Sequence, residues 1–376
     1  MGQRKIAINI ERLNDYMDRH DLAALVIRSG KNFTYLAGFS CPGTLSRHLD
    51  HTDSPREVLL IWPRNGEPTL VLDESTSAVA ARDGWIKNIV GYKGYSENPY
   101  GRAADILSDL GLAQSRIGAE KRYLSAARWE ELQALLPRAK IVDCWRMMAE
   151  VRWIKTPAEV DILKMGADIL DEAYLEVFPT VRPGQTEAQV HARIVEACIR
   201  HGAQWAHGML QSSRNPVPSY GGESELAFKA GDIIRNDYVS YYLGYPGGHL
   251  SRTAVIGKPT DEQLRTYKIR SGIYRSTVEQ CRVGARAGDI YQFAADAIAK
   301  YNAKPIPLVG HSVGPWMHQQ EPYIIEGADE RLEAGMVLAM EPHFGPWQLQ
   351  DLYLITETGP KLLSDRFSTQ EMFVIA

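Results

Sequence analysis

Cysteine is scarce in this sequence and is not paired at short spacing. The 376 residues contain four cysteines and no CxxC motif. Because closely spaced cysteines mark structural zinc sites and thiol redox centres, neither class of protein is indicated. The N-terminus also lacks the basic and then apolar layout of a secretory signal. We therefore expect a cytoplasmic protein with free thiols at Cys41, Cys144, Cys198 and Cys281.

Long apolar runs and an excess of one charge are missing as well. No segment approaches the roughly 20 apolar residues that span a bilayer. Lys and Arg number 42 against 46 Asp and Glu, so the net charge of -4 offers no attraction for nucleic acid or an anionic membrane. We therefore expect the partner to be a small-molecule substrate, and neither nucleic acid nor a membrane.

The length favours two domains, and the pattern changes near residue 150. Before that point helical and strand-like segments alternate. Residues 10–20 have helical spacing, 22–28 are strand-like, and 58–63 with 68–73 predict a hairpin around a polar turn. We predict a mixed α/β domain over residues 1–150.

The second part, residues 151–376, combines long helices with β-rich segments. Pro157 stands at a favoured first helical position, and the residues expected to face inward are Val160, Leu163, Met165, Ala167 and Leu170. Further helices are predicted from near Thr186, over 260–281 and over 289–301.

Residues 231–253, GDIIRNDYVSYYLGYPGGHLSRT, predict a hairpin that turns at its glycines. Asp237 and His249 then lie on the two opposite strands of this hairpin. Two ligand-type side chains that face each other across a sheet can share a metal ion or a substrate. The alternative is a purely structural hairpin, in which Asp237 bonds to backbone and His249 lies at an edge.

A second group of chemically active residues follows downstream. His311 and His318 lie seven residues apart with glycines between them. Glu341 ends an apolar strand, a poor place for a carboxylate without a cation or a proton partner. Asp, Glu and several His at strand ends are typical ligands of a transition metal. A single His in such a place is more often a hydrogen-bonded core residue, which applies equally to His207 and His343.

The order of motifs resembles the creatinase, prolidase and aminopeptidase P superfamily, the pita-bread hydrolases. The resemblance is carried by RLNDYMDRHDLAALVIRSGKNFTYLAGF, VRWIKTPAEVDILKMGADI, GDIIRND, HLSRT, GHSVG, GMVLAMEP and LQDLYLIT, which cover nearly the whole chain. It implies an α+β fold. A creatinase-like α/β domain over 1–150 precedes a pita-bread catalytic domain over 151–376, with helices outside a curved antiparallel sheet, and the protein is a homodimer.

The resemblance also implies a metal centre with altered ligands. Metallopeptidase members hold two ions on two Asp, one His and two Glu, of which Asp237, His311 and Glu341 are matched here. His249 and Gln350 stand in place of the two carboxylates that bridge the ions. Without bridging negative charge, two divalent cations about 3.5 to 4 Å apart repel each other, which argues against a dinuclear site.

Two states of the site remain open. In one, Asp237, His249, His311 and Glu341 hold a single divalent ion, Zn, Mn or Fe, as a catalytic set with open positions. In the other no metal binds, as in creatinase, and His249 or His311 acts as general base with Glu341 as acid or binding carboxylate. We prefer the metal-free state, although the gain of a His at a ligand position supports the metal-bound one.

Two positions depart from both named subclasses. Arg214, before Asn215-Pro216-Val217, stands where creatinase has its catalytic His, and Ser219-Tyr220 stands where the peptidases place a His near the substrate. His318 does match the second active-site His of the family, and we expect it to shuttle protons.

The polar loop 40–56 contains Arg47, His48 and His51. An Arg grips a carboxylate through two hydrogen bonds. In creatinase-like dimers the N-terminal domain of one subunit reaches the active site of the other, so we expect this loop to complete the partner's site. A solvated loop is the alternative. Other predicted substrate-binding residues are Arg252, Trp316 and His343.

We therefore predict a hydrolase that cleaves a C–N bond in a small non-peptide amide, amidine or cyclic amide, similar to creatinase or ectoine hydrolase. The catalytic residues are predicted to be His249, His311, His318 and Glu341. One alternative is a mononuclear metal-dependent peptidase of the Xaa-Pro type. Others are an inactive pita-bread binding module and a lyase that uses the same His and Glu.

Overall fold

The computed structural model describes residues 7–41, 55–217, 224–316 and 318–376. The chain forms two compact units, Met1–Arg152 with Thr156–Ala158, and Trp153–Lys155 with Glu159–Ala376. All four cysteines are buried and free, as predicted. None of the helices within the described ranges combines the length and the apolar character of a bilayer-spanning segment.

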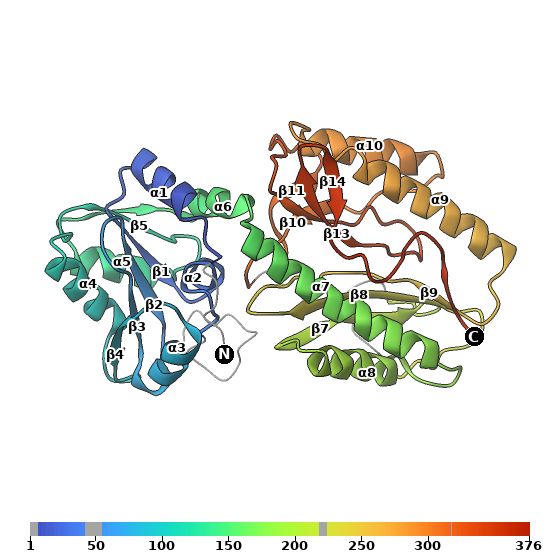
Figure 1. Cartoon of the computed structure of the whole chain (residues 1–376), viewed down its shortest axis with the longest axis horizontal. Helices are drawn as coiled ribbons and strands as arrows, with labels where there is room; N and C mark the ends of the chain where they lie inside the picture. Colours follow the sequence, from blue (N-terminus) through green and yellow to red (C-terminus); the bar gives the residue numbers. More distant parts are fainter. Residues whose placement is uncertain (1–6, 42–54, 218–223, 317) are drawn as a thin grey trace. The chain divides into compact units, whose positions relative to one another are not determined.

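The first unit is built on a six-stranded mixed sheet in the order β4-β3-β2-β1-β5-β6 (Figure 1). β1 and β2, and β2 and β3, pair antiparallel, while the other three pairs are parallel. The hairpin predicted between residues 58 and 73 is confirmed as β2 and β3. The strands are β1 Ala24–Arg28, β2 Leu59–Pro63, β3 Thr69–Asp73, β4 Asn88–Tyr92, β5 Arg116–Ala119 and β6 Lys140–Asp143.

Helices surround this sheet, and α1 confirms the helix predicted over residues 10–20. α2 occupies a segment whose pattern did not predict a helix. It ends at Gly38, whose φ of 74° lies in the left-handed region that glycine adopts readily. The helices are α1 Ile10–Arg19, α2 Lys31–Ala37, α3 Ser77–Asp83, α4 Pro99–Asp109, α5 Ala126–Leu135 and α6 Trp145–Trp153.

The second unit contains two sheets, in the orders β11-β10-β12-β13-β14 and β15-β9-β8-β7. Their pairs are antiparallel, as expected, except that β15 joins β9 in parallel. Helices and sheets together confirm the predicted α+β class. The strands are β7 Trp205–Ser212, β8 Ile233–Tyr241, β9 Ala254–Ile256, β10 Leu308–Ser312, β11 Gln320–Ile325, β12 Val337–Met340, β13 Asp351–Thr356, β14 Gly359–Leu362 and β15 Phe373–Ile375.

Each sheet of this unit has its own pair of helices. α7 Pro157–Val177 and α8 Glu187–Arg200 share a core with β7, β8 and β9, and α9 Asp261–Val278 and α10 Ala287–Ala299 share one with β10 to β13 (Figure 1). One detail of the prediction was wrong. Met165 is exposed, because it lies off the helical spacing that buries Leu163, Ala167 and Leu170.

The two sheets meet at Ser251 and Gln350, whose backbones pair in an isolated antiparallel bridge. Ser251 follows the hairpin that begins with β8. Its glycines serve close packing as well as the turn, because a Cβ on Gly247 would lie 2.7 Å from Leu163 Cα of α7. The hairpin is thus pressed against α7, which fixes the position of the residues that follow it.

Candidate active site

The predicted hairpin is confirmed, and it brings Asp237 and His249 together. Leu250 pairs with Tyr238 across the hairpin. His249 Nε2 lies 3.2 Å from Asp237 Oδ1, and the His249 ring is buried. Burial lowers the pKa of His249 to about 3, so the contact joins a neutral imidazole to the carboxyl group. The structural alternative, with His249 at an edge, does not hold.

Three of the predicted histidines form one cluster. The rings of His249 and His311 are stacked with their centroids 4.9 Å apart, and His318 meets His249 edge-on at 4.6 Å. His311 comes from β10, and His318 lies between β10 and β11. His249 thus meets histidines that lie 62 and 69 residues later in the sequence, at the junction of the two sheets.

Glu341, directly after β12, lies between two histidines. Its Oε1 is 3.5 Å from His311 Nε2, and its Oε2 is 3.4 Å from His343 Nε2. Glu341 is only 5% exposed. The pKa of Glu341 is raised to about 8, chiefly by burial, while His311 opposes this shift and the nearby Asp237 contributes to it. The carboxyl group is therefore largely protonated at neutral pH.

The tautomer of His311 is set by its own strand. Nδ1 lies 2.8 Å from the carbonyl oxygen of Ser312 and donates its proton there, which leaves the Nε2 lone pair directed toward Glu341. Burial lowers the pKa of His311 to about 4. A neutral imidazole base thus faces a protonated carboxylic acid. Environments that separate the pKa values of neighbouring groups in this way typically assign acid and base roles.

Four buried atoms in this cluster have no hydrogen-bond partner among the described residues, namely Asp237 Oδ1, His311 Nε2, Glu341 Oε1 and His343 Nε2. Buried polar atoms without a partner are costly and uncommon. Their concentration around one point indicates that the cluster is arranged for a bound molecule and does not serve packing alone.

The two changed ligand positions, His249 and Gln350, contact each other. Ser251 Oγ donates to Gln350 Oε1 at 3.2 Å, which turns the amide nitrogen toward His249. That nitrogen lies 3.1 Å from Nδ1 and 3.3 Å from Nε2 of the ring. An amide N–H only donates, so it faces the ring nitrogen that lacks a proton. The pair is neutral where bridging carboxylates would supply negative charge.

Each carboxyl group of this site lies beside at least one imidazole. Asp237 approaches His249, while Glu341 approaches His311 and His343. Within the described residues, no three or more His, Cys, Asp and Glu are grouped as a metal site requires. The neutral His249 and Gln350 pair, at the positions of the two bridging carboxylates, does not fit the dinuclear centre of the family's metallopeptidase members, as expected from the sequence.

Aromatic side chains lie beside the histidines. Trp205 and Tyr241 stack with ring centroids 3.6 Å apart, and His207 stacks on Trp205 at 4.9 Å. Tyr241 Oη donates to the carbonyl oxygen of Trp316 at 3.0 Å. Trp316 itself is half-buried, so its indole remains a candidate for contact with a substrate.

The prediction that Arg252 binds substrate was wrong. Its side chain is completely buried, with Nε 2.8 Å from Asp171 Oδ1 and Nη1 2.8 Å from Asp351 Oδ1. Arg252 thus ties α7 to β13 as part of the framework. Arg214, at the position of the creatinase His, is likewise held by Asp232 through two contacts of 2.6 and 2.8 Å.

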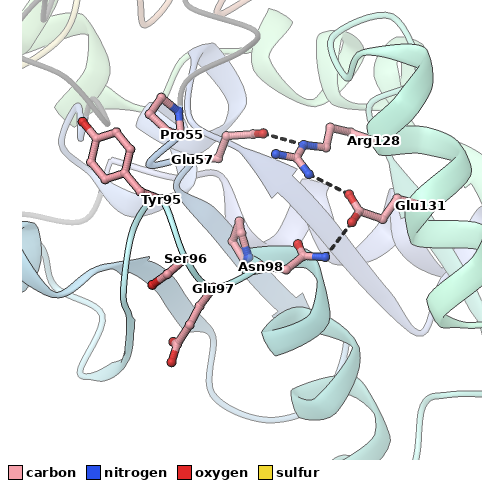
Figure 2. Close-up of a pocket in the computed structure, with 9 residues that line it drawn as sticks. Pro55, Glu57, Tyr95, Ser96, Glu97, Asn98, Arg128 and Glu131 are labelled. Carbon is pink, nitrogen blue, oxygen red and sulfur yellow. Dashed lines mark hydrogen bonds and ion pairs between the residues drawn. The ribbon is translucent and has the colours of Figure 1, made fainter.

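The predicted substrate-binding residues Arg47, His48 and His51 lie outside the described residues. In the first unit, a cavity of about 390 Å³ lies near Pro55. Figure 2 shows that Arg128 reaches both Glu57 and Glu131 there, each at 2.7 Å. Glu97, which also lines the cavity, pairs with Arg102, so each charged side chain of this wall has an ion-pair partner.

Known proteins resemble the chain over its whole length. Residues 161–357 match metallopeptidase family M24, and residues 9–154 match the creatinase/prolidase N-terminal domain. A Xaa-Pro dipeptidase from Lactobacillus delbrueckii subsp. lactis is 24% identical over 371 residues, which cover 94% of this chain and 96% of that protein. A creatinase from a Bacillus species is 25% identical over 374 residues, 93% of this chain and 87% of that protein. The crystal structure of dipeptidase PepE from Mycobacterium ulcerans is 27% identical, with a TM-score of 0.78 over 100% of both chains.

Proposed function

This chain belongs to metallopeptidase family M24, a hydrolase family that acts on C–N bonds, and we propose on that premise that it hydrolyses dipeptides of the Xaa-Pro type. The expected superfamily and pita-bread fold are confirmed. The likeness to dipeptidases favours a peptide substrate over the small non-peptide amide that we expected first.

The observation that carries the proposal is the pairing of neutral His311 with protonated Glu341. His311 Nε2 takes a proton from water while the water oxygen bonds to the carbonyl carbon. Glu341 then protonates the nitrogen as the C–N bond breaks, and the proton held by His311 returns to Glu341. We assign His318 to the relay of protons at the edge of the cluster, and His249 and His343 to its positioning.

We propose that the protein works with no metal or with one divalent ion, Zn, Mn or Fe, and not with two. The neutral contact between Gln350 and His249 supports this proposal. Elemental analysis before and after chelation tests it, with His249→Ala as the comparison. Two tightly held ions per chain would overturn it.

A second candidate is hydrolysis of a small non-peptide C–N bond, as the name of the creatinase relative suggests. It is favoured by the loss of both bridging carboxylates, because hydrolysis by His and Glu side chains alone, as in creatinase, needs no pair of metal ions. A panel of Xaa-Pro dipeptides, creatine and cyclic amides separates the candidates. Turnover must disappear in His311→Ala and Glu341→Gln, since activity in both variants would place the site elsewhere.

We further propose a cytoplasmic homodimer in which loop 40–56, with Arg47, His48 and His51, completes the partner's site. Sedimentation measures the assembly. Mixing inactive Arg47→Ala with inactive Glu341→Gln subunits should then restore part of the activity, because one site of the mixed dimer has both residues intact. Absence of recovery in a confirmed mixed dimer would contradict the loop's role.

A further inference from the structure

Arg270 on α9 is a buried cation that has no counter-ion among the residues that the structure describes. It is 5% exposed, and its Nη2 is fully buried without a hydrogen-bond partner. No carboxylate of the described residues forms an ion pair with it. Arg252 offers the contrast inside the same unit, because its equally buried guanidinium is held by two aspartates. Buried arginines normally have such partners.

The neighbours of Arg270 include an aromatic ring, a glycine and the His343 imidazole, whose pKa is lowered chiefly by burial and further by the guanidinium. Arg270 Cζ lies over the ring of Phe344, 3.0 Å from the centroid. Burial alone lowers the pKa of Arg270 to about 8, with no neighbouring acid to oppose it. A Cβ on Gly345 would lie 3.2 Å from Nη2, so glycine keeps the space beside the guanidinium open.

Arg270 lines a cavity of about 580 Å³, large enough for a small organic molecule. The remaining walls are mainly apolar, formed by Ile233, Ile269, Tyr301, Phe344, Pro346 and Trp347. Glu262 and Arg265 also line it, but they form an ion pair with each other. His249, His311, His318, Glu341 and His343 are not among the lining residues, although Phe344 and Gly345 of the wall directly follow His343 in the chain.

We propose that this cavity binds a small carboxylate with an apolar or aromatic body, whose carboxylate is held by Arg270. A carboxylate accepts two parallel hydrogen bonds from a guanidinium, and it neutralises the buried charge. The aromatic walls hold the organic part of the ligand. Binding at this cavity requires no hydrolytic activity, so the proposal can be tested independently of the proposed function.

The test is isothermal titration of the full-length protein with phenylacetate, phenylacetamide and acetate. Phenylacetamide keeps the shape and loses the charge, and acetate keeps the charge and loses the ring. We expect each to bind at least tenfold more weakly than phenylacetate. Equal binding of phenylacetate and phenylacetamide, or no binding of phenylacetate, would overturn the proposal without any variant.

Matched variants then locate the site. Arg270→Met should abolish phenylacetate binding and still fold, because it removes an unpaired buried charge and keeps most of the side-chain volume. Arg265→Met, at the same cavity, should leave the affinity within about twofold, since its charge is already paired. Glu341→Gln should also leave it unchanged. Loss of binding in Glu341→Gln with retention in Arg270→Met would place phenylacetate in the catalytic cluster and refute the proposal.

Discussion

Replacing Glu341 with Gln should abolish activity and at the same time stabilise the folded protein. The side chain is almost fully buried, and burial raises its pKa from the ordinary 4.5 to about 8. Each tenfold step in proton affinity corresponds to about 1.4 kcal/mol. The ionised form of Glu341 is therefore about 5 kcal/mol less favourable in the folded than in the unfolded state, and Gln, which cannot ionise, avoids this cost.

The sign of the effect with pH follows from the raised pKa. Below pH 4.5 the carboxyl group is protonated in both the folded and the unfolded state, so wild type and variant differ little. Between pH 4.5 and 8 the unfolded state loses this proton first, and wild-type stability falls relative to the variant. The advantage of the variant should reach about 3 kcal/mol near pH 7 and level off above pH 8.

Urea unfolding of both proteins at pH 5, 6, 7 and 8 measures this difference, as about four pH points are enough to define its slope. The control is Glu357→Gln, which changes an exposed carboxyl in the turn after β13 and should give a difference independent of pH. A pH-independent difference for Glu341→Gln, or a variant less stable than wild type at pH 8, would refute the assignment of a buried protonated acid.

Three further changes test the framework and the metal question. The double variant His249→Asp with Gln350→Glu returns negative charge to both altered ligand positions, so elemental analysis should find two divalent ions per chain. An unchanged metal content would contradict the argument that the missing bridging charge prevents a dinuclear site. Arg252→Met leaves two buried carboxylates unpaired and should lower the free energy of unfolding by about 3 to 5 kcal/mol; a loss below about 1 kcal/mol would contradict the importance of these ion pairs. Gly247→Ala forces a Cβ against α7 and should cost about 1 to 3 kcal/mol. Gly272→Ala, whose Cβ would meet nothing within 4 Å, should be neutral or stabilising in the same denaturation assay.

The contact between Asp237 and His249 could be predicted from the sequence because both residues lie on one hairpin. A short turn fixes which residues face each other, so local pattern is sufficient. The approach of Glu341 to His311 is different, since it depends on pairing between β10 and β12, which are separated along the chain by β11. It was predicted only through the resemblance to a family, and spacing alone left it open.

Arg252 shows where sequence reasoning failed. Its neighbours in HLSRT suggested a role at the site, but its partners Asp171 and Asp351 come from distant elements. Nothing in local pattern distinguishes an Arg that meets a substrate from one that meets two buried carboxylates. The parallel addition of β15 to β9 is similar, because it joins segments more than a hundred residues apart without a turn between them.

Arg270 was missed although its position carried a signal. It lies on the helical face that buries Tyr267, Ser271 and Tyr274, at spacings of three and four residues. That periodicity places a charged residue on the inner face of α9. The pattern indicates burial, but whether a counter-ion is present is a property of the folded chain alone.

The bridge between Ser251 and Gln350 has a consequence for how this protein changes over evolutionary time. The orientation of the Gln350 amide in one sheet is set by a hydroxyl group of the other. A substitution at either of these two positions therefore alters the hydrogen bond that the residue at the other position can form. Compensating pairs of substitutions should accordingly connect positions 251 and 350 in related sequences.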